Sequence, residues 1–313
     1  MMGEISKTFD DPVKVLAYTN SLLRNSRKIV LFTESRNDDF LYEEFFEDEN
    51  VALLPLRGKP KCKELAELCY NNGINLTASF TDDDYDWLFP KPKYNHITTD
   101  FFDLEAFSIF SSKWDRIIRE IVSLEAIQNK FGIQSYIDFR KKVVDICLPV
   151  GVLMYFNQKK KRKIEFKTYM FDRKCKIPAN LDNSISLVTK RLRNLNPSKI
   201  DSKLEDELIK EGEKFISSIP EHEKCKYVSS TLVSKCIASI GKTHNLFKAV
   251  KGPDDKKIVV LVNYLTLKGQ FRSHVDEKIF YTTKMYKSVM DMLRTNDLMK
   301  APNKSNKRPV QQG

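Results

Sequence analysis

Short apolar runs alternate with segments of helical spacing along the first hundred residues of the chain. The apolar runs have the length of buried strands, and the segments between them carry apolar side chains three and four residues apart. We expect strands at 28–33, 51–56, 76–80 and 94–98, and helices at 11–26, 38–47 and 63–70. The order strand, helix, strand, helix, strand is typical of a parallel α/β sheet.

The periodicity changes near residue 113, and most of the remaining chain has helical spacing. Helices are expected from 113, at 135–148, through most of 181–240 and at 272–298, with a strand at 164–171; the run 258–265 fits either a strand or a buried helix. We therefore predict an α/β domain at 1–112, a largely helical and basic domain at 113–298, and a disordered tail at 299–313.

Acidic residues directly follow two of the expected strands. Glu34 closes the first apolar run with Asp38 four residues later, and Asp82, Asp83 and Asp84 follow the third strand. Ligand sites of open α/β sheets form beyond the carboxyl ends of the strands. Carboxylates gathered there repel one another unless a cation holds them, and Mg²⁺ or Mn²⁺ suits an all-oxygen ligand set. This pattern predicts metal-dependent phosphoryl-transfer chemistry.

The chain carries an excess of positive charge, concentrated in its second half. Its 53 Lys and Arg residues outnumber 42 Asp and Glu residues, which gives a formal net charge of +11. The run Lys159, Lys160, Lys161, Arg162 and Lys163 is expected to bind nucleic acid through its phosphates. The run is flanked by aromatic residues that could stack on bases, namely Tyr155, Phe156, Phe166 and Tyr169.

Several classes of protein are disfavoured by the sequence. The six cysteines are scattered and form no Cys-x-x-Cys pair, and the four histidines show no ligand spacing, so a zinc site is not expected. No apolar stretch of about 18 residues or more is present and the first residues do not resemble a signal peptide, so we expect a cytoplasmic protein with free thiols and no membrane partner.

The acidic motifs resemble those of Toprim domains. These domains have a glutamate after the first strand, in a Glu-Gly-x-x-Asp context that Glu34 and Asp38 match, although Ser35 stands in place of the glycine. Their Asp-x-Asp motif after a later strand corresponds to Asp82 and Asp84. The third acid of the family corresponds to Glu105, with Asp103 nearby; the motifs lie within residues 28–110.

Within this group, the chain resembles a Toprim-like family of unknown-function domains related to the overcoming-lysogenization-defect nucleases. That family includes the nuclease effector of the two-component PARIS anti-phage system, in which an ATPase partner holds the effector until infection is sensed. A helical half follows the Toprim half in this family, as expected here. The turn expected at Lys268–Gln270 is similar to a late glycine turn of the family.

The resemblance implies a Mg²⁺- or Mn²⁺-dependent endonuclease that cleaves RNA, such as tRNA, or DNA. It implies an ABC- or AAA-type ATPase partner and leaves formation of a homodimer open. Glu34, Asp82 and Asp84 would be the principal metal ligands, with Glu105 completing one site and Asp38 binding metal or orienting a ligand. Lys59, in the turn after the second strand, is the candidate to stabilise charge on the phosphate.

Two other kinds of function remain open at this stage. An aspartate-based phosphatase or a receiver domain also places acids at strand ends, but the phosphatase needs an aspartate where this chain has Glu34. A catalytically silent Toprim-like interaction module is the second alternative, because Ser35 departs from the family motif. Single features have ordinary explanations as well: Glu34 and Glu105 could be first-turn acids of helices, and Lys159–Lys163 a solvated surface.

Overall fold

The structure is a computed structural model that describes residues 11–26, 28–46, 50–166, 180–251, 257–259, 262–296 and 298. These residues form two compact units. The α/β unit contains the described residues of Met1–Thr81, Pro90–Thr98 and Tyr281–Gly313. The helical unit contains those of Asp82–Phe89 and Thr99–Phe280. The division differs from the expected boundary at residue 112 in two ways. The described residues of Tyr281–Gly313 belong to the α/β unit, whereas Asp82–Phe89 and residues 99–112 belong to the helical unit.

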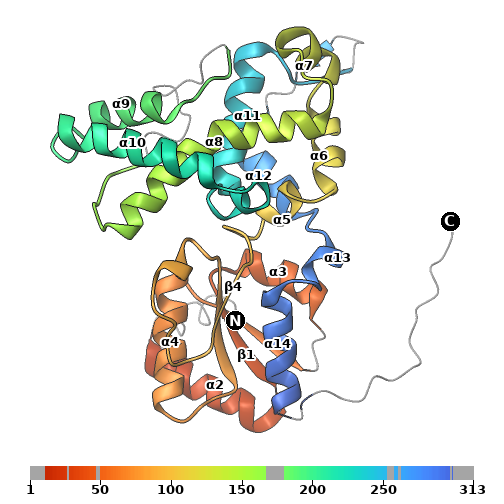
Figure 1. Ribbon diagram of the computed structural model, residues 1–313. Coiled ribbons are helices and arrows are strands. Elements are labelled where there is room, and N and C mark those ends of the chain that lie inside the picture. Colours follow the sequence, from red (N-terminus) through yellow and green to blue (C-terminus); the bar gives the residue numbers. More distant parts are fainter. Residues whose placement is uncertain are drawn as a thin grey trace. The chain divides into compact units, whose positions relative to one another are not determined.

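The α/β unit has four strands and four long helices among its described residues (Figure 1). Its elements are α2 (Pro12–Ser26), β1 (Ile29–Thr33), α3 (Arg36–Phe45), β2 (Val51–Pro55), α4 (Lys59–Asn71), β3 (Thr77–Thr81), β4 (His96–Thr98) and α14 (Lys284–Thr295). The strand order is β2-β1-β3-β4, and every neighbouring pair is parallel. The α/β fold predicted from the sequence is confirmed, with strand and helix ends shifted by a few residues.

Helices cover both faces of this sheet. On one face, Val15 of α2 and Leu65 of α4 pack against Val30 and Phe32 of β1. On the other face, Tyr42 of α3 meets Phe80 of β3 with the ring centroids 4.6 Å apart. Figure 1 shows α4 and α14 on opposite sides of the sheet. Because both faces are covered, every residue of β1 and β3 is buried, as continuous apolar runs predict.

The helical unit is built around α8 (Tyr136–Lys159), the longest described helix. Its other elements are η1 (Asp86–Leu88), α5 (Ala106–Ile109), α6 (Lys113–Ile121), α7 (Leu124–Phe131), α9 (Ile185–Leu195), α10 (Ser202–Ser218), η2 (Glu221–Lys226), α11 (Ser230–His244), β5 (Ala249–Lys251), β6 (Lys257–Val259), α12 (Tyr264–Arg272) and α13 (Glu277–Phe280). Strands β5 and β6 form an antiparallel pair. The prediction of a mostly helical second part is confirmed.

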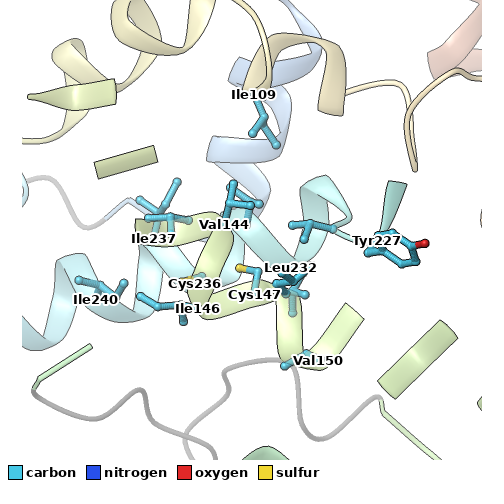
Figure 2. Packing of buried hydrophobic residues seen from close by; sticks show 14 of the residues in the cluster. Ile109, Val144, Ile146, Cys147, Val150, Tyr227, Leu232, Cys236, Ile237 and Ile240 are labelled. Atoms are coloured by element: carbon cyan, nitrogen blue, oxygen red, sulfur yellow. The ribbon is translucent and has the colours of Figure 1, made fainter. Parts of the chain in front are cut away.

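Figure 2 shows the core where α8 and α11 pack together. Val144 and Cys147 of α8 face Cys236 and Ile237 of α11, and all four side chains are buried. Burial, and then the hydrogen bond with Cys236, hold the pKa of the Cys147 thiol well above its usual range. These cysteines therefore behave as small apolar core residues.

Some expected elements differ in the structure. Helix α8 continues through Pro149 to Lys159 instead of ending at Leu148, because this stretch is packed on several sides within the core. The single closing helix expected at 272–298 is replaced by α13 and α14, and Thr283 caps α14 by accepting a hydrogen bond from the Tyr286 amide. Residues 268–270 lie inside α12 and form no turn.

Two further expectations concern segments that the structure describes in part or not at all. Ile164–Phe166 form no strand, and the rest of the strand expected at 164–171 lies outside the described residues, together with the tail at 299–313. The ambiguous run 258–265 contains both the end of β6 and the beginning of α12. A short apolar run can supply buried residues to either kind of element, so its pattern did not distinguish them.

Close approach of backbones at Gly151 generates a testable prediction. A Cβ atom on Gly151 would lie 1.9 Å from the backbone oxygen of Tyr227, so alanine there requires η2 or α8 to move. We expect Gly151→Ala to lower the free energy of unfolding by about 2 kcal/mol or more, in the range of overpacked cores. Chemical denaturation measures this directly.

The control is Gly269 in α12, where a Cβ meets nothing within 4 Å. Gly269→Ala should leave stability unchanged or raise it by up to about 1 kcal/mol, since alanine is the better helix former. Equal effects of the two substitutions would contradict the packing of α8 against Tyr227.

Candidate metal and nucleic-acid site

Glu34 directly follows β1 and is half-buried. Its backbone oxygen accepts a hydrogen bond from the Gly58 amide at 3.0 Å, which ties the end of β1 to the turn after β2. Gly58 has φ of 95°, a conformation that favours glycine. The expected Arg57–Lys59 turn therefore fixes the backbone that carries Glu34.

Ser35, which replaces the glycine of the Toprim motif, holds the neighbouring acid in place. Its hydroxyl donates to Asp38 Oδ2 at 2.9 Å, and the Asp38 amide donates to the Ser35 backbone oxygen at 3.1 Å. The hydroxyl thus orients one Asp38 oxygen, a role that glycine cannot perform. Sequence reasoning treated Ser35 only as a departure from the motif and missed this contact.

The charges of Glu34 and Asp38 converge on Cys62 of α4. The Cys62 thiol is buried and donates to the backbone oxygen of Thr33 at 3.2 Å. Burial raises the pKa of this thiol far above its usual range, and the carboxylates of Glu34 and then Asp38 raise it further. Within the α/β unit, the structure therefore brings these two predicted site residues to the same end of β1.

A third acid at this strand end, Asp39, is not among the predicted site residues. It is 4% exposed, and the hydroxyl of Thr33 donates to its Oδ1. Burial raises the pKa of Asp39 from 3.8 to about 6, the Thr33 bond opposes the rise, and the charges of Asp38 and Glu43 add to it. Burial and the neighbouring acids therefore destabilise the ionised form of Asp39.

This arrangement predicts a pH-dependent gain of stability from Asp39→Asn. Because the folded pKa of about 6 exceeds the ordinary 3.8, the folded protein binds the extra proton between these values. The wild-type free energy of unfolding should therefore fall as pH rises from about 4 to about 6. Asp39→Asn removes this loss, so it should stabilise the protein at pH 8 by up to about 3 kcal/mol and have little effect at pH 4.

Denaturation at the two pH values measures the difference, with Glu44→Gln on the exposed side of α3 as the control. A gain of stability that is the same at pH 4 and pH 8 would contradict the buried, partly protonated state of Asp39.

Lys59 is the first residue of α4 and follows Gly58 directly. Its side chain is half-buried. The structure places it after β2, at the same edge of the sheet as the residues after β1, because the two strands are parallel and in register from Ile29 and Val51 onward. Its predicted contact with a phosphate stays a prediction.

The acidic run that follows β3 belongs to the helical unit and is fixed by backbone contacts. Asp82 Oδ1 accepts a hydrogen bond from the Leu104 amide at 3.0 Å, and the Asp83 amide donates to Thr99 Oγ1 at 3.0 Å. Asp84 has φ of 44°, an uncommon conformation for a residue with a side chain. The run is therefore a defined loop and not a loosely solvated turn.

Tyr85 anchors the end of this loop in the core of the helical unit. Its hydroxyl donates to the Gly151 backbone oxygen at 2.7 Å, and its ring meets Phe102 edge-on with the centroids 4.9 Å apart. Burial, followed by the charge of Asp84, raises the pKa of Tyr85 well above its usual range. Asp84 itself remains exposed beside this buried anchor.

Asp103 and Glu105, which follow β4, form a buried pair of acids. Asp103 Oδ2 accepts hydrogen bonds from the amide and hydroxyl of Ser230, at 2.8 and 2.9 Å. Ser230 also donates to Glu105 Oε2 at 3.4 Å. Burial, and then the charge of Glu105, raise the pKa of Asp103. The two acids therefore share one polar environment around Ser230.

Two cations of α12 neutralise Glu105. Arg272 donates to Glu105 Oε1 from Nε at 2.9 Å and from Nη2 at 2.5 Å, and Lys268 Nζ lies 3.6 Å from the same oxygen. Glu105 is thus held in an ion-pair cluster, and a metal would compete with these cations for Oε1. Arg272 is separated from Glu105 by 167 residues, so no sequence pattern indicated the pair.

The predicted metal ligands are therefore distributed over both units. Glu34 and Asp38 lie in the α/β unit, and Asp82, Asp84 and Glu105 lie in the helical unit. Among the residues that the structure describes, no three His, Cys, Asp or Glu side chains form a group that could hold a metal ion. The chemistry of the predicted ligands, which are all carboxylates, fits Mg²⁺ and Mn²⁺.

The basic run at the end of α8 is partly neutralised within the helical unit. Lys160 Nζ contacts Glu207 and Glu211 of α10, each at 2.9 Å, and Arg162 Nη2 contacts Glu207 at 2.6 Å. These contacts raise the pKa of Lys160 and lower the pKa of Glu207. Lys159, Lys161 and Lys163 are exposed. Within this run, Lys160 and Arg162 therefore form ion pairs with α10, and the other three cations face solvent.

This division predicts different effects of two sets of substitutions. Changing Lys159, Lys161 and Lys163 to Gln should weaken nucleic-acid binding and reduce its salt slope by up to about 2 for single strands, at about 0.7 per phosphate contact. Changing Lys160 and Arg162 to Gln should mainly lower the melting temperature, because it breaks ion pairs with α10. Fluorescence anisotropy at several salt concentrations and thermal unfolding separate the two. An unchanged slope in the first variant would show that the run is a solvated face.

The aromatic residues expected to stack on bases are not on the surface. Tyr155, Phe156 and Phe166 are 4–7% exposed and belong to the hydrophobic core, which corrects that expectation, while Tyr169 lies outside the described residues. Tyr155 and Phe156 lie on the inward face of α8, where both pack against Phe215 of α10. An exposed aromatic residue that sequence reasoning missed, Trp87, stands next to the acidic loop.

Comparison of the chain with protein-family models, with curated proteins and with solved structures finds no match. None of the described helices combines the length and the apolar character needed to cross a membrane.

Proposed function

We propose that the chain is a metal-dependent nuclease that cleaves phosphodiester bonds of RNA or DNA with Mg²⁺ or Mn²⁺. The observation that carries the proposal is the position of the acids in the sheet. Strand β1 lies between β2 and β3. The connection after β1 therefore leads to the neighbour on one side, β2, and the connection after β2 crosses to the neighbour on the other side, β3. The carboxyl ends of β1 and β3 therefore flank the topological switch point, where α/β sheets bind ligands.

The register of β1 and β3 also supports placing these acids at the same edge of the sheet. Thr33 pairs with Phe80, so the level of Glu34 is that of Thr81, the last residue of β3. Asp82 is the next residue of the chain. Two neighbouring parallel strands thus each end in an acid, and both acids follow a fully buried strand. Ser35 is the N-cap residue of α3, and its hydroxyl orients Asp38 at the same end of β1 as Glu34.

In this proposal Glu34, Asp82 and Asp84 bind the metal, and Asp38 supports them as a ligand or through its bond with Ser35. A divalent metal held by these residues would supply Lewis-acid chemistry, polarising the phosphate and activating a water molecule for in-line attack. Lys59, at the beginning of α4, neutralises charge on the phosphate. Glu105 holds Arg272 and Lys268 close to the loop after β4 in an ion-pair cluster on the helical unit.

The proposed biological role follows the family resemblance. We infer an effector of an anti-phage defence system that acts on nucleic acid in the cytoplasm and is controlled by an ATPase partner. The net charge of +11 supports a polyanionic substrate, because a basic protein attracts nucleic acid at long range. The exposed cations at the end of α8 lie in the unit that would bind substrate or partner.

Incubation of the purified chain with RNA and with DNA in Mg²⁺, Mn²⁺ or EDTA tests the proposal, with and without a co-encoded ATPase. We expect cleavage that needs the metal. Glu34→Ala should reduce it by at least about 100-fold, since loss of a ligand removes several kcal/mol of transition-state stabilisation.

The matched control is Glu67→Ala, which removes an exposed acid from α4. It should cleave as the wild type does. Full activity of a folded Glu34→Ala variant, or cleavage that persists in EDTA, would refute the metal-dependent mechanism. Absence of cleavage under every condition would favour a Toprim-like interaction module.

A further inference from the structure

Three aromatic rings form a stack in the helical unit that ends at the surface. Tyr155 of α8 stacks on Phe215 of α10, with the centroids 5.1 Å apart and the planes at 8°. It also stacks on Trp87, with the centroids 5.4 Å apart and the planes at 20°. Tyr155 is 4% exposed, whereas Trp87 is 46% exposed. Trp87 is therefore the solvent-exposed end of the stack.

The indole ring of Trp87 is held in a fixed orientation. Besides its contact with Tyr155, it meets the ring of Tyr227 nearly perpendicularly, at 89° and 6.2 Å between centroids. Tyr85, two residues earlier, is anchored on Gly151. A large apolar ring that is rigid and half-exposed costs little conformational entropy when it binds a flat ligand.

The position of Trp87 in the chain connects it to the acidic loop. It is the third residue after Asp84, in the short helix η1 that directly continues the loop. Both residues belong to the helical unit. An aromatic platform and the loop that carries two proposed metal ligands are therefore parts of one rigid segment.

A cation lies beside the aromatic stack within the helical unit. Lys159 Nζ lies 3.3 Å from the Tyr155 hydroxyl and 5.5 Å from the centre of its ring, so a cation accompanies the stack. A flat apolar ring beside a cation complements an unpaired nucleobase whose backbone carries phosphates.

We propose that Trp87 is a stacking platform for an unpaired base, so the substrate presents a single-stranded or looped segment to the acidic loop. This inference rests on the proposed function, which it deepens by naming the substrate class. A base in a duplex has both faces covered by its neighbours and cannot stack on Trp87 unless it leaves the helix. A single-stranded segment offers the face at no such cost.

The test compares two oligonucleotides that differ only in their bases. A single-stranded deoxyadenosine decamer and an abasic strand of the same length are titrated in EDTA, so that no cleavage occurs. The wild type should bind the decamer about 5- to 150-fold more tightly than the abasic strand, the range that stacking of one base supports. Trp87→Ala should abolish this preference, while Trp87→Phe should keep part of it.

Two controls separate stacking from unfolding. Trp87→Leu keeps apolar bulk on Tyr155 without an indole, and Tyr70→Ala removes another exposed aromatic residue, 42% exposed on α4. The first should lose the preference for bases and the second should retain it. Trp114 is fully buried, so quenching of tryptophan fluorescence by the decamer should come from Trp87.

The outcomes are distinct from those of the cleavage assay. Binding with no preference for bases, no binding of either strand, or a preference that survives in Trp87→Ala and Trp87→Leu would overturn the platform, even if the chain is a nuclease. A preference that depends on Trp87 in a chain without metal-dependent cleavage would support the platform and refute the nuclease.

Discussion

The parallel pairing of β1 with β3 determines where the acids of the proposed site leave the sheet. Both strands are buried along their whole length, so their register is fixed by packing on two faces. Because β1 and β3 are parallel, both strands end at the same edge of the sheet. The sequence places Glu34 after β1 and Asp82 after β3, so acids follow both central strands at that edge. A shift of one residue would instead turn the buried side chains of β3 to the opposite faces.

The strand-end acids are held in ways that cost stability. Asp39 is buried beside Asp38, and Asp103 is buried beside Glu105. Burial raises the pKa of Asp39 and of Asp103, and the charge of the neighbouring acid raises each pKa further. Neutral residues at these positions would pack without repulsion. Acids that remain buried despite this cost, with Thr33 donating to Asp39 and Ser230 donating to Asp103, are typical of sites where carboxyl groups have a function.

Local patterns predicted much of the fold and less of the site. Strand and helix positions in the α/β unit followed from continuous apolar runs, because both faces of the sheet are covered. Contacts between distant residues had no local signal: Arg272 with Glu105, Tyr85 with Gly151, and α14 returning to the sheet. The inward direction of Tyr155 was also hidden, since aromatics beside lysines look alike on a buried and an exposed helix face. Trp87 was missed because its neighbours Asp86, Leu88 and Phe89 do not show which of these side chains is exposed.

Binding of Mn²⁺ in the absence of nucleic acid tests directly whether the acids after β1 and β3 hold a metal ion. The electron paramagnetic resonance signal of free Mn²⁺ is followed while wild-type protein, Glu34→Ala and Asp82→Ala are added in turn. If acids after both β1 and β3 hold the metal, the wild type should remove Mn²⁺ from solution, and each single substitution should weaken binding by about tenfold or more. Equal Mn²⁺ binding by the wild type and both variants would contradict the proposal that the ends of these two strands form a metal site.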